Sequence, residues 1–227
     1  MKLLLIGHGR MGKLVEELAP SYGCEIAGIV TSRAAESAIA QAGHADVAVD
    51  FSAGPAVAAN LAALAAKGLN VVIGTTGWHD PDGHLKAIAE RAGIGVFASA
   101  NFSLGMSIFQ IVVEDAARRF AARPDVGAWI HESHHSAKKD APSGTALMLE
   151  AVMEQAGYSR GIDVSSTRAG SIPGTHVVGF DAQSETVMLT HTVRDRAVFA
   201  RGALEAAKWL KGRRGWFTMR DLVSNQG

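Results

Sequence analysis

Short apolar segments alternate with amphipathic segments along the first hundred residues. The apolar runs are typical of buried strands, and the segments between them carry apolar residues at helical spacing. Strand and helix in alternation predict a parallel sheet wound with helices on both faces. The expected strands are residues 3–6, 25–30, 46–51, 70–73 and 94–98, and the expected helices are residues 13–19, 55–67 and 84–92.

The pattern changes after residue 103. Apolar residues at helical spacing predict one long helix over residues 104–120. Residues 128–135 predict a strand, and residues 164–193 are rich in Thr and Val in alternation, which indicates a mixed or antiparallel sheet. A last helix is expected over residues 197–211. The middle of the chain is therefore an α+β region that differs from what precedes it.

A glycine motif lies between the first expected strand and the first expected helix. It reads G-H-G-R-M-G, the G-x-G-x-x-G spacing in which glycines let the backbone approach a pyrophosphate. We expect a dinucleotide to bind here, and a plain tight turn is the alternative. The candidate cofactor contacts in this loop are Gly7, His8, Gly9, Arg10, Met11 and Gly12.

The end of the second expected strand bears on the choice of dinucleotide. Thr31, Ser32 and Arg33 follow that strand, and no acidic residue occurs before Glu36. A carboxylate there would bind the ribose 2'-hydroxyl and repel a 2'-phosphate. Hydroxyls with a guanidinium favour NADPH over NADH, with Ser32 and Arg33 as contacts. The alternative is that Arg33 is an ordinary surface cation.

Residues 132–146 read E-S-H-H-S-A-K-K-D-A-P-S-G-T-A and concentrate ionisable groups in one stretch. A helix is expected to begin after Ser143, a good N-cap, so that the first N–H groups of the helix are free to hold an anion. Lys138 adds positive charge. The segment suits a small carboxylate substrate with a histidine or lysine as proton donor.

This stretch resembles the E-x-H-H-x-x-K-x-D-x-P-S-G-T-A signature of the dihydrodipicolinate reductase family, matched without a gap. Other stretches agree in order over nearly the whole chain. The resemblance implies NAD(P)H-dependent reduction of 4-hydroxy-tetrahydrodipicolinate to tetrahydrodipicolinate in diaminopimelate and lysine biosynthesis. It assigns His134 as proton donor and Lys138 as the group that binds or polarises the substrate. Further implied substrate contacts are His135, Gly144, Thr145 and Arg196, and further cofactor contacts are Gly74, Thr75, Thr76, Ser99, Ala100, Asn101 and Phe102.

The resemblance also implies an architecture. A Rossmann-type doubly wound parallel sheet domain is expected from residues 1–103 plus 197–227, and an α+β domain for substrate binding and tetramerisation from residues 104–196. The family is typically a homotetramer. The stretches 168–170 and 174–176 match family stretches and are assigned structural or subunit-contact roles.

Composition limits the possible partners and compartment. Lysine plus arginine and aspartate plus glutamate number 22 each, which argues against nucleic acid or an anionic membrane as the main partner. No apolar run is long enough for a membrane span or a signal peptide, so a cytoplasmic protein is expected. The single cysteine, Cys24, is expected to be a buried thiol.

Several alternatives stay open at this level. A protein of the same architecture could bind a dinucleotide as a redox sensor, or reduce another small cyclic dicarboxylate. Lys138 could form a Schiff base if it were desolvated. A zinc site among residues 131, 132, 134 and 135 is not expected, because neighbouring residues of a strand point to opposite faces.

Overall fold

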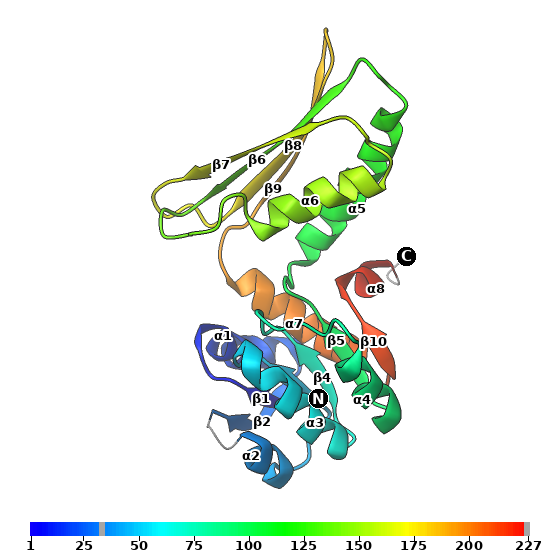
Figure 1. The fold of residues 1–227 in the computed structure, drawn as a ribbon. Coiled ribbons are helices and arrows are strands. Elements are labelled where there is room, and N and C mark those ends of the chain that lie inside the picture. Colours follow the sequence, from blue (N-terminus) through cyan, green and yellow to red (C-terminus); the bar gives the residue numbers. More distant parts are fainter. Residues whose placement is uncertain (32–34, 225–227) are drawn as a thin grey trace. The chain divides into compact units, whose positions relative to one another are not determined.

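The computed structural model describes residues 1–31 and 35–224, and it confirms the predicted fold class (Figure 1). The chain forms two compact units. The first joins Met1–Leu104 to the segment that begins at Ala197, and the second is Gly105–Arg196. No described helix has the length and apolar character needed to cross a membrane.

The first unit contains a six-stranded sheet in the order β10-β5-β4-β3-β1-β2, and all its pairings are parallel. The chain runs from β1 outward to β2, and then returns to build the other side of the sheet from β3. Such a switch point opens a crevice at the carboxyl ends of the strands. The strands are β1 Lys2–Ile6, β2 Glu25–Val30, β3 Val47–Asp50, β4 Asn70–Ile73, β5 Gly95–Ala98 and β10 Gly215–Phe217.

Helices cover both faces of this sheet, and each face has its own apolar core. Strand interiors that are apolar at consecutive positions fit this arrangement, because both of their faces are buried. The buried thiol of Cys24 belongs to one of these cores, as predicted. The helices are α1 Arg10–Leu18, α2 Ala35–Gln41, α3 Val57–Ala66, α4 His84–Ala92, α7 Ala197–Leu210 and α8 Met219–Ser224.

The second unit is a mixed sheet in the order β7-β6-β8-β9, with two helices on one of its faces (Figure 1). β6 pairs in parallel with β7, and the other two pairings are antiparallel. A single core joins the helices to the sheet, with Tyr158 and Phe180 among its largest members. The elements are α5 Leu104–Ala121, β6 Gly127–His134, α6 Gly144–Gln155, β7 Ile162–Arg168, β8 Thr175–Asp181 and β9 Thr186–Thr192.

Several boundaries differ from the predictions by one to three residues, and three differences are described below. β6 ends at His134, so the alternation argument does not extend to His135. The expected helix over residues 55–67 opens with a 3-10 turn, Gly54–Ala56, because Pro55 suits the first turn of a helix. α2 was not anticipated. Its alanine-rich sequence has one buried residue, Ile39, and therefore little apolar periodicity.

α7 lies against the chain that leaves β5, and the contact depends on a glycine. A Cβ atom on Gly202 would lie 1.7 Å from the carbonyl oxygen of Phe102. Alanines on the same helix are fully buried, among them Ala203 and Ala206. Small residues thus let α7 approach the backbone of the first unit closely.

We expect Gly202→Ala to lower the free energy of unfolding by about 2 kcal/mol, because the added methyl group has no space and the backbone must shift. Urea unfolding followed by tryptophan fluorescence measures this. Gly43→Ala is the matched control, since a Cβ atom there meets nothing within 4 Å. Equal stability of the two variants would contradict the close packing.

Candidate active site

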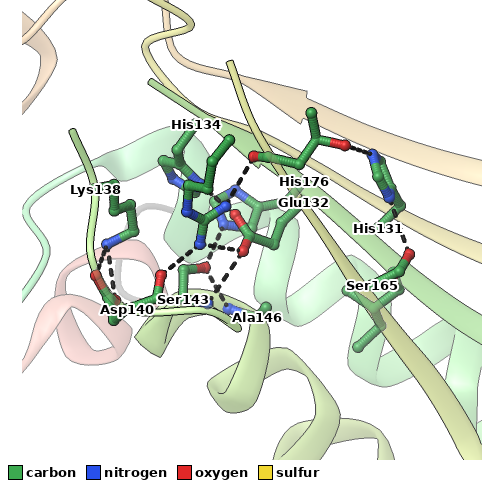
Figure 2. A network of polar contacts seen from close by, with 12 residues as sticks. His131, Glu132, His134, Lys138, Asp140, Ser143, Ala146, Ser165 and His176 are labelled. Carbon is green, nitrogen blue, oxygen red and sulfur yellow. Dashed lines mark hydrogen bonds and ion pairs between the residues drawn. The ribbon is translucent and has the colours of Figure 1, made fainter. Parts of the chain in front are cut away.

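A buried carboxylate lies at the centre of the polar cluster in the second unit (Figure 2). Glu132 is 0% exposed. Its Oε2 atom bonds Nδ1 of His134, and its Oε1 atom accepts from Arg168 Nη2 at 2.6 Å and from the Ser143 backbone N–H at 3.2 Å. Glu132 and His134 meet because residues two apart on a strand share a face. Both carboxylate oxygens are therefore engaged.

The neighbouring strands supply the rest of this cluster. Arg168 on β7 is paired in register with His134, and His176 on β8 is paired with Glu132. The rings of His134 and His176 meet edge to face with centroids 5.1 Å apart. His131, on the opposite face of β6, contacts Ser165 instead at 2.9 Å. Three strands therefore converge on one face.

The start of α6 joins the same cluster. Ser143 is the N-cap, as predicted, and its hydroxyl oxygen accepts from the Ala146 N–H at 3.2 Å. The same hydroxyl lies 3.2 Å from His176 Nε2. Gly144 and Thr145 form the first turn, and a Cβ atom on Gly144 would meet nothing within 4 Å. The Gly144 backbone N–H is hydrogen-bonded to the Asp140 carboxylate, which shows that this helix N-terminus suits an anion.

Lys138 lies in the loop between β6 and α6 and is half-buried. Its Nζ atom is 2.8 Å from the Asp140 carboxylate, and the Asp140 carbonyl accepts from Arg168 Nη2 at 2.5 Å. Lys138 is thereby joined to the Glu132 cluster through Asp140 and Arg168. The structure thus links His134, Lys138 and the helix N-terminus through one polar network.

The charges in this cluster follow from burial and partners. Burial opposes ionisation of Glu132, but hydrogen bonds from Arg168, Ser166 and His134 outweigh it and lower the pKa of this carboxyl to about 2. Burial lowers the pKa of His134, although its bond to Glu132 works in the opposite direction. Burial, with the nearby His134, lowers the pKa of His176 to about 4. At neutral pH, Glu132 is ionised and both histidines are neutral.

Glu132, His134 and His176 have ligand atoms within 4.8 Å of one another, which is also a spacing for a metal ion. The contacts argue against that use, because both oxygens of Glu132 already accept hydrogen bonds and one donor is the cation Arg168. A metal ion would have to displace that guanidinium.

The glycine loop of the first unit borders a cleft of about 410 Å³. Gly7 has φ +86°, and a Cβ atom on it would lie 2.4 Å from the Phe51 carbonyl oxygen. Gly9 precedes α1 and has nothing within 4 Å of its Cβ position. Open space before a helix N-terminus fits a dinucleotide pyrophosphate. The lining residues include Gly7, Gly9, Val30, Thr31, Phe51, Ser52 and Asn60.

Other predicted cofactor residues of this loop face different surroundings. His8 Nε2 lies 2.6 Å from Glu16, and Arg10 is exposed at the start of α1. The Met11 side chain packs against the core. A Cβ atom on Gly12 would lie 2.2 Å from the Gly7 carbonyl oxygen, so a side chain there has no room. Ser32 and Arg33 lie outside the described residues.

A second cleft, of about 420 Å³, lies at the ends of β4 and β5. Thr75, Thr76, Ser99 and Ala100 line it. Gly74 instead leaves space for the Phe51 ring, because a Cβ atom on Gly74 would lie 2.1 Å from that ring. Asn101 and Phe102 turn inward: Asn101 Oδ1 accepts from the Ser103 N–H at 2.9 Å, and Phe102 is buried among aromatic rings.

Asp50, at the end of β3, joins the loops that line the two clefts. It is 1% exposed, and its carboxylate accepts from the Ser52 N–H at 2.8 Å, from Thr75 Oγ1 at 3.0 Å and from Asn60 Nδ2 at 2.9 Å. Asp50 was not among the residues predicted for a site. Its position could have been noticed in the sequence, because an acidic residue ends an otherwise apolar strand there.

Glu132, Arg168 and His176 were also not among the predicted site residues. Arg168 and His176 lie in stretches that were assigned structural or subunit-contact roles. Strand register brings them to His134, and register is not visible in local sequence. Among the predicted substrate residues, His135 directly follows β6 and is half-buried, and Arg196 is exposed just before α7.

Two family models match the chain, "Dihydrodipicolinate reductase, N-terminus" over residues 1–102 and "Dihydrodipicolinate reductase, C-terminus" over residues 105–223. A 4-hydroxy-tetrahydrodipicolinate reductase of Stenotrophomonas maltophilia is 40% identical over 243 residues, covering 98% of each chain. One of Christiangramia forsetii is 32% identical over 236 residues, covering 99% of this chain and 98% of the relative.

Solved structures agree in fold. A dipicolinate-bound dihydrodipicolinate reductase from Paenisporosarcina sp. TG-14 superposes with a TM-score of 0.84 at 20% identity, covering 96% of this chain and 97% of that one. An oxidoreductase from Agrobacterium radiobacter, solved with NAD+, L-tartaric acid and magnesium, has a TM-score of 0.61 at 13% identity, covering 100% and 89%.

The low pKa of Glu132 predicts a pH-dependent stability. Because the folded-state pKa of about 2 lies below the ordinary 4.5, the contribution is fully present above pH 4.5 and is lost as the pH falls through about 2. We expect the free energy of unfolding of the wild type to exceed that of Glu132→Gln by on the order of 3 kcal/mol at pH 7. This difference should shrink toward pH 2. Urea unfolding at several pH values measures it, and a constant difference would contradict the ionised carboxylate.

Proposed function

The chain belongs to the dihydrodipicolinate reductase family, and we propose that His134 and Lys138 carry its proton chemistry, with NADPH as the preferred hydride donor. Its reaction is the reduction of 4-hydroxy-tetrahydrodipicolinate in diaminopimelate and lysine biosynthesis, with a nicotinamide dinucleotide as cofactor. The observation that supports the residue assignment is one polar network in which buried Glu132 contacts His134 and the α6 N-terminus directly, and Lys138 through Asp140 and Arg168.

The substrate is a dicarboxylate, and the second unit offers matching positive groups. The N–H groups of Gly144 and Thr145 at the start of α6 would hold one carboxylate, with Lys138 beside them. His135 and Arg196 are proposed as further contacts. Lysine is a mobile point charge, so Lys138 can exchange Asp140 for a substrate carboxylate without leaving its loop.

His134 is the proposed proton donor. In the free protein its ring is neutral at pH 7, since burial lowers its pKa. Two substrate carboxylates nearby favour the protonated ring, because opposite charge stabilises the imidazolium. We infer that His134 takes up a proton as the dicarboxylate binds, and returns it to the reduced ring.

The first unit is the proposed cofactor domain. Gly7, Gly9 and the first turn of α1 would hold the pyrophosphate, and Thr75, Thr76, Ser99 and Ala100 would line the nicotinamide end. When bound, the cofactor supplies the hydride. Asp50 keeps the two lining loops at a set distance, because its single carboxylate accepts from both. We also propose that the protein is a homotetramer and works in the cytoplasm. Sedimentation velocity measures the number of subunits in the assembly.

We expect Lys138→Ala and His134→Gln each to lower kcat by about 100-fold or more, the usual loss when a proton-transfer group is removed. The assay follows loss of reduced-nicotinamide absorbance with the condensation product of pyruvate and aspartate semialdehyde made in situ. Lys139→Ala is the matched control, because this neighbouring lysine is exposed.

Three outcomes would overturn this assignment. Wild-type activity in both variants would move the proton chemistry elsewhere. A folded wild type that binds a dinucleotide but turns over neither cofactor would support the redox-sensor alternative. Turnover only with other compounds in a panel of cyclic dicarboxylates would indicate a different substrate.

We expect Arg33→Ala to lower the preference for NADPH over NADH by about tenfold, because a guanidinium that bonds a 2'-phosphate contributes a charge-assisted hydrogen bond. The measurement is kcat/KM with each cofactor. Arg91→Ala, which removes an exposed arginine on α4, is the control. An unchanged ratio would make Arg33 an ordinary surface cation.

A further inference from the structure

We propose that Glu132 is the positioning residue of this reaction: its carboxylate fixes the tautomer and orientation of His134 and, through Ser143, the start of the anion-binding helix. This inference rests on the proposed role of His134 and deepens it. The carboxylate touches neither cofactor nor substrate in this scheme. It acts through the two groups that do.

The tautomer follows from the hydrogen bond. An ionised carboxylate only accepts, so His134 Nδ1 must carry the proton of its bond to Glu132 Oε2. Nε2 is then the ring atom that is free to take up and release a proton. Nε2 lies 3.1 Å from the position that a Cβ atom on Gly174 would occupy, so the lack of a side chain there leaves this edge of the ring uncovered.

Arg168 keeps the negative charge on Glu132. A buried carboxylate without a partner would take up a proton, and a neutral carboxyl could not fix the tautomer in the same way. Arg168 Nη2 donates to Oε1 at 2.6 Å, and the same nitrogen donates to the Asp140 carbonyl at 2.5 Å. Arg168 thus links the Glu132 carboxylate to the loop that carries Lys138.

The third contact of Glu132 reaches the helix. Oε1 accepts from the Ser143 backbone N–H at 3.2 Å, and Ser143 caps α6 through its own hydroxyl. One carboxylate therefore sets both the proton donor and the first turn that would hold a substrate carboxylate. A shift of Glu132 displaces the two together.

The ionisable groups that act on the His134 ring come from four places. They are Glu132 on the same strand, Arg168 on β7, His176 on β8, and Lys138 in the following loop. Only Glu132 favours the protonated ring. Arg168 and Lys138 are cations that oppose it, and His176 is neutral at pH 7.

The decisive variant is Glu132→Gln, which keeps the shape and removes the charge. With its amide oxygen toward Arg168, glutamine presents N–H to His134 Nδ1 and forces the proton onto Nε2. We expect kcat to fall by about 100-fold, with KM for NADPH within about twofold of wild type. The alkaline limb of the kcat profile should shift about one pH unit lower, because the group that favours the imidazolium is gone.

Two further variants separate charge from general disruption. Glu154→Gln removes an equivalent charge from an exposed position on α6 and should leave kcat and the pH profile unchanged. Glu132→Asp keeps the charge with a shorter reach, so it should lose part of kcat and keep the alkaline limb near that of wild type. A fall in kcat for Glu132→Gln with an unmoved pH limb would reduce Glu132 to a purely structural role.

The tautomer is also measurable without substrate, cofactor or variant. Nitrogen-15 NMR of the histidine rings in the wild-type protein at pH 7 should show His134 with a protonated Nδ1 and a bare Nε2. The Nε2–H tautomer as the main form would overturn the proposal. A wild type without turnover would count against the proposed function and leave this spectrum unaffected, so the two failures are distinguishable.

Discussion

The buried ion pair between Glu132 and Arg168 is the constraint on which the second unit depends. Removing a carboxylate from water costs several kcal/mol, and the bonds that offset this cost must come from residues placed around it. Here they come from β6, from β7 and from the start of α6. The strand register and the helix start are therefore tied to one charge. Loss of either partner would leave the other buried and unpaired, the costlier state.

The first unit uses a comparable device at a different point. Asp50 is also a buried carboxylate, but its donors are a backbone N–H, a hydroxyl and an amide, all neutral. It sits where the chain leaves β3, beside the switch point of the sheet. The glycines around it serve the same end, because Gly7 and Gly74 let their neighbours lie against Phe51 without a side chain between them. The rim of the proposed cofactor cleft is thus held by polar bonds and by close packing.

The fold was largely predictable from sequence because both periodicities are strong. The interiors of the buried parallel strands are apolar at consecutive positions, and the start of α6 is marked by a serine followed by a small first turn. α2 was not predictable from its sequence, since it buries only Ile39. In the site, His134 and Lys138 could be found because they lie in one short segment. Arg168 and His176 could not, since they reach the site through pairing with β6 from some forty residues away.

The charge balance of the cluster supports the proposal that substrate and proton arrive together. Glu132 and Asp140 carry two negative charges, Arg168 and Lys138 carry two positive charges, and the two histidines are neutral at pH 7. A bound dicarboxylate adds two negative charges that these residues do not balance. Protonation of a histidine then relieves the excess. His134 is better placed than His176 to accept this proton, because its Nδ1–H already has a carboxylate partner, whereas the hydrogen bond of His176 Nε2 is to the neutral hydroxyl of Ser143. The imidazolium would thus form where the reduced ring needs it.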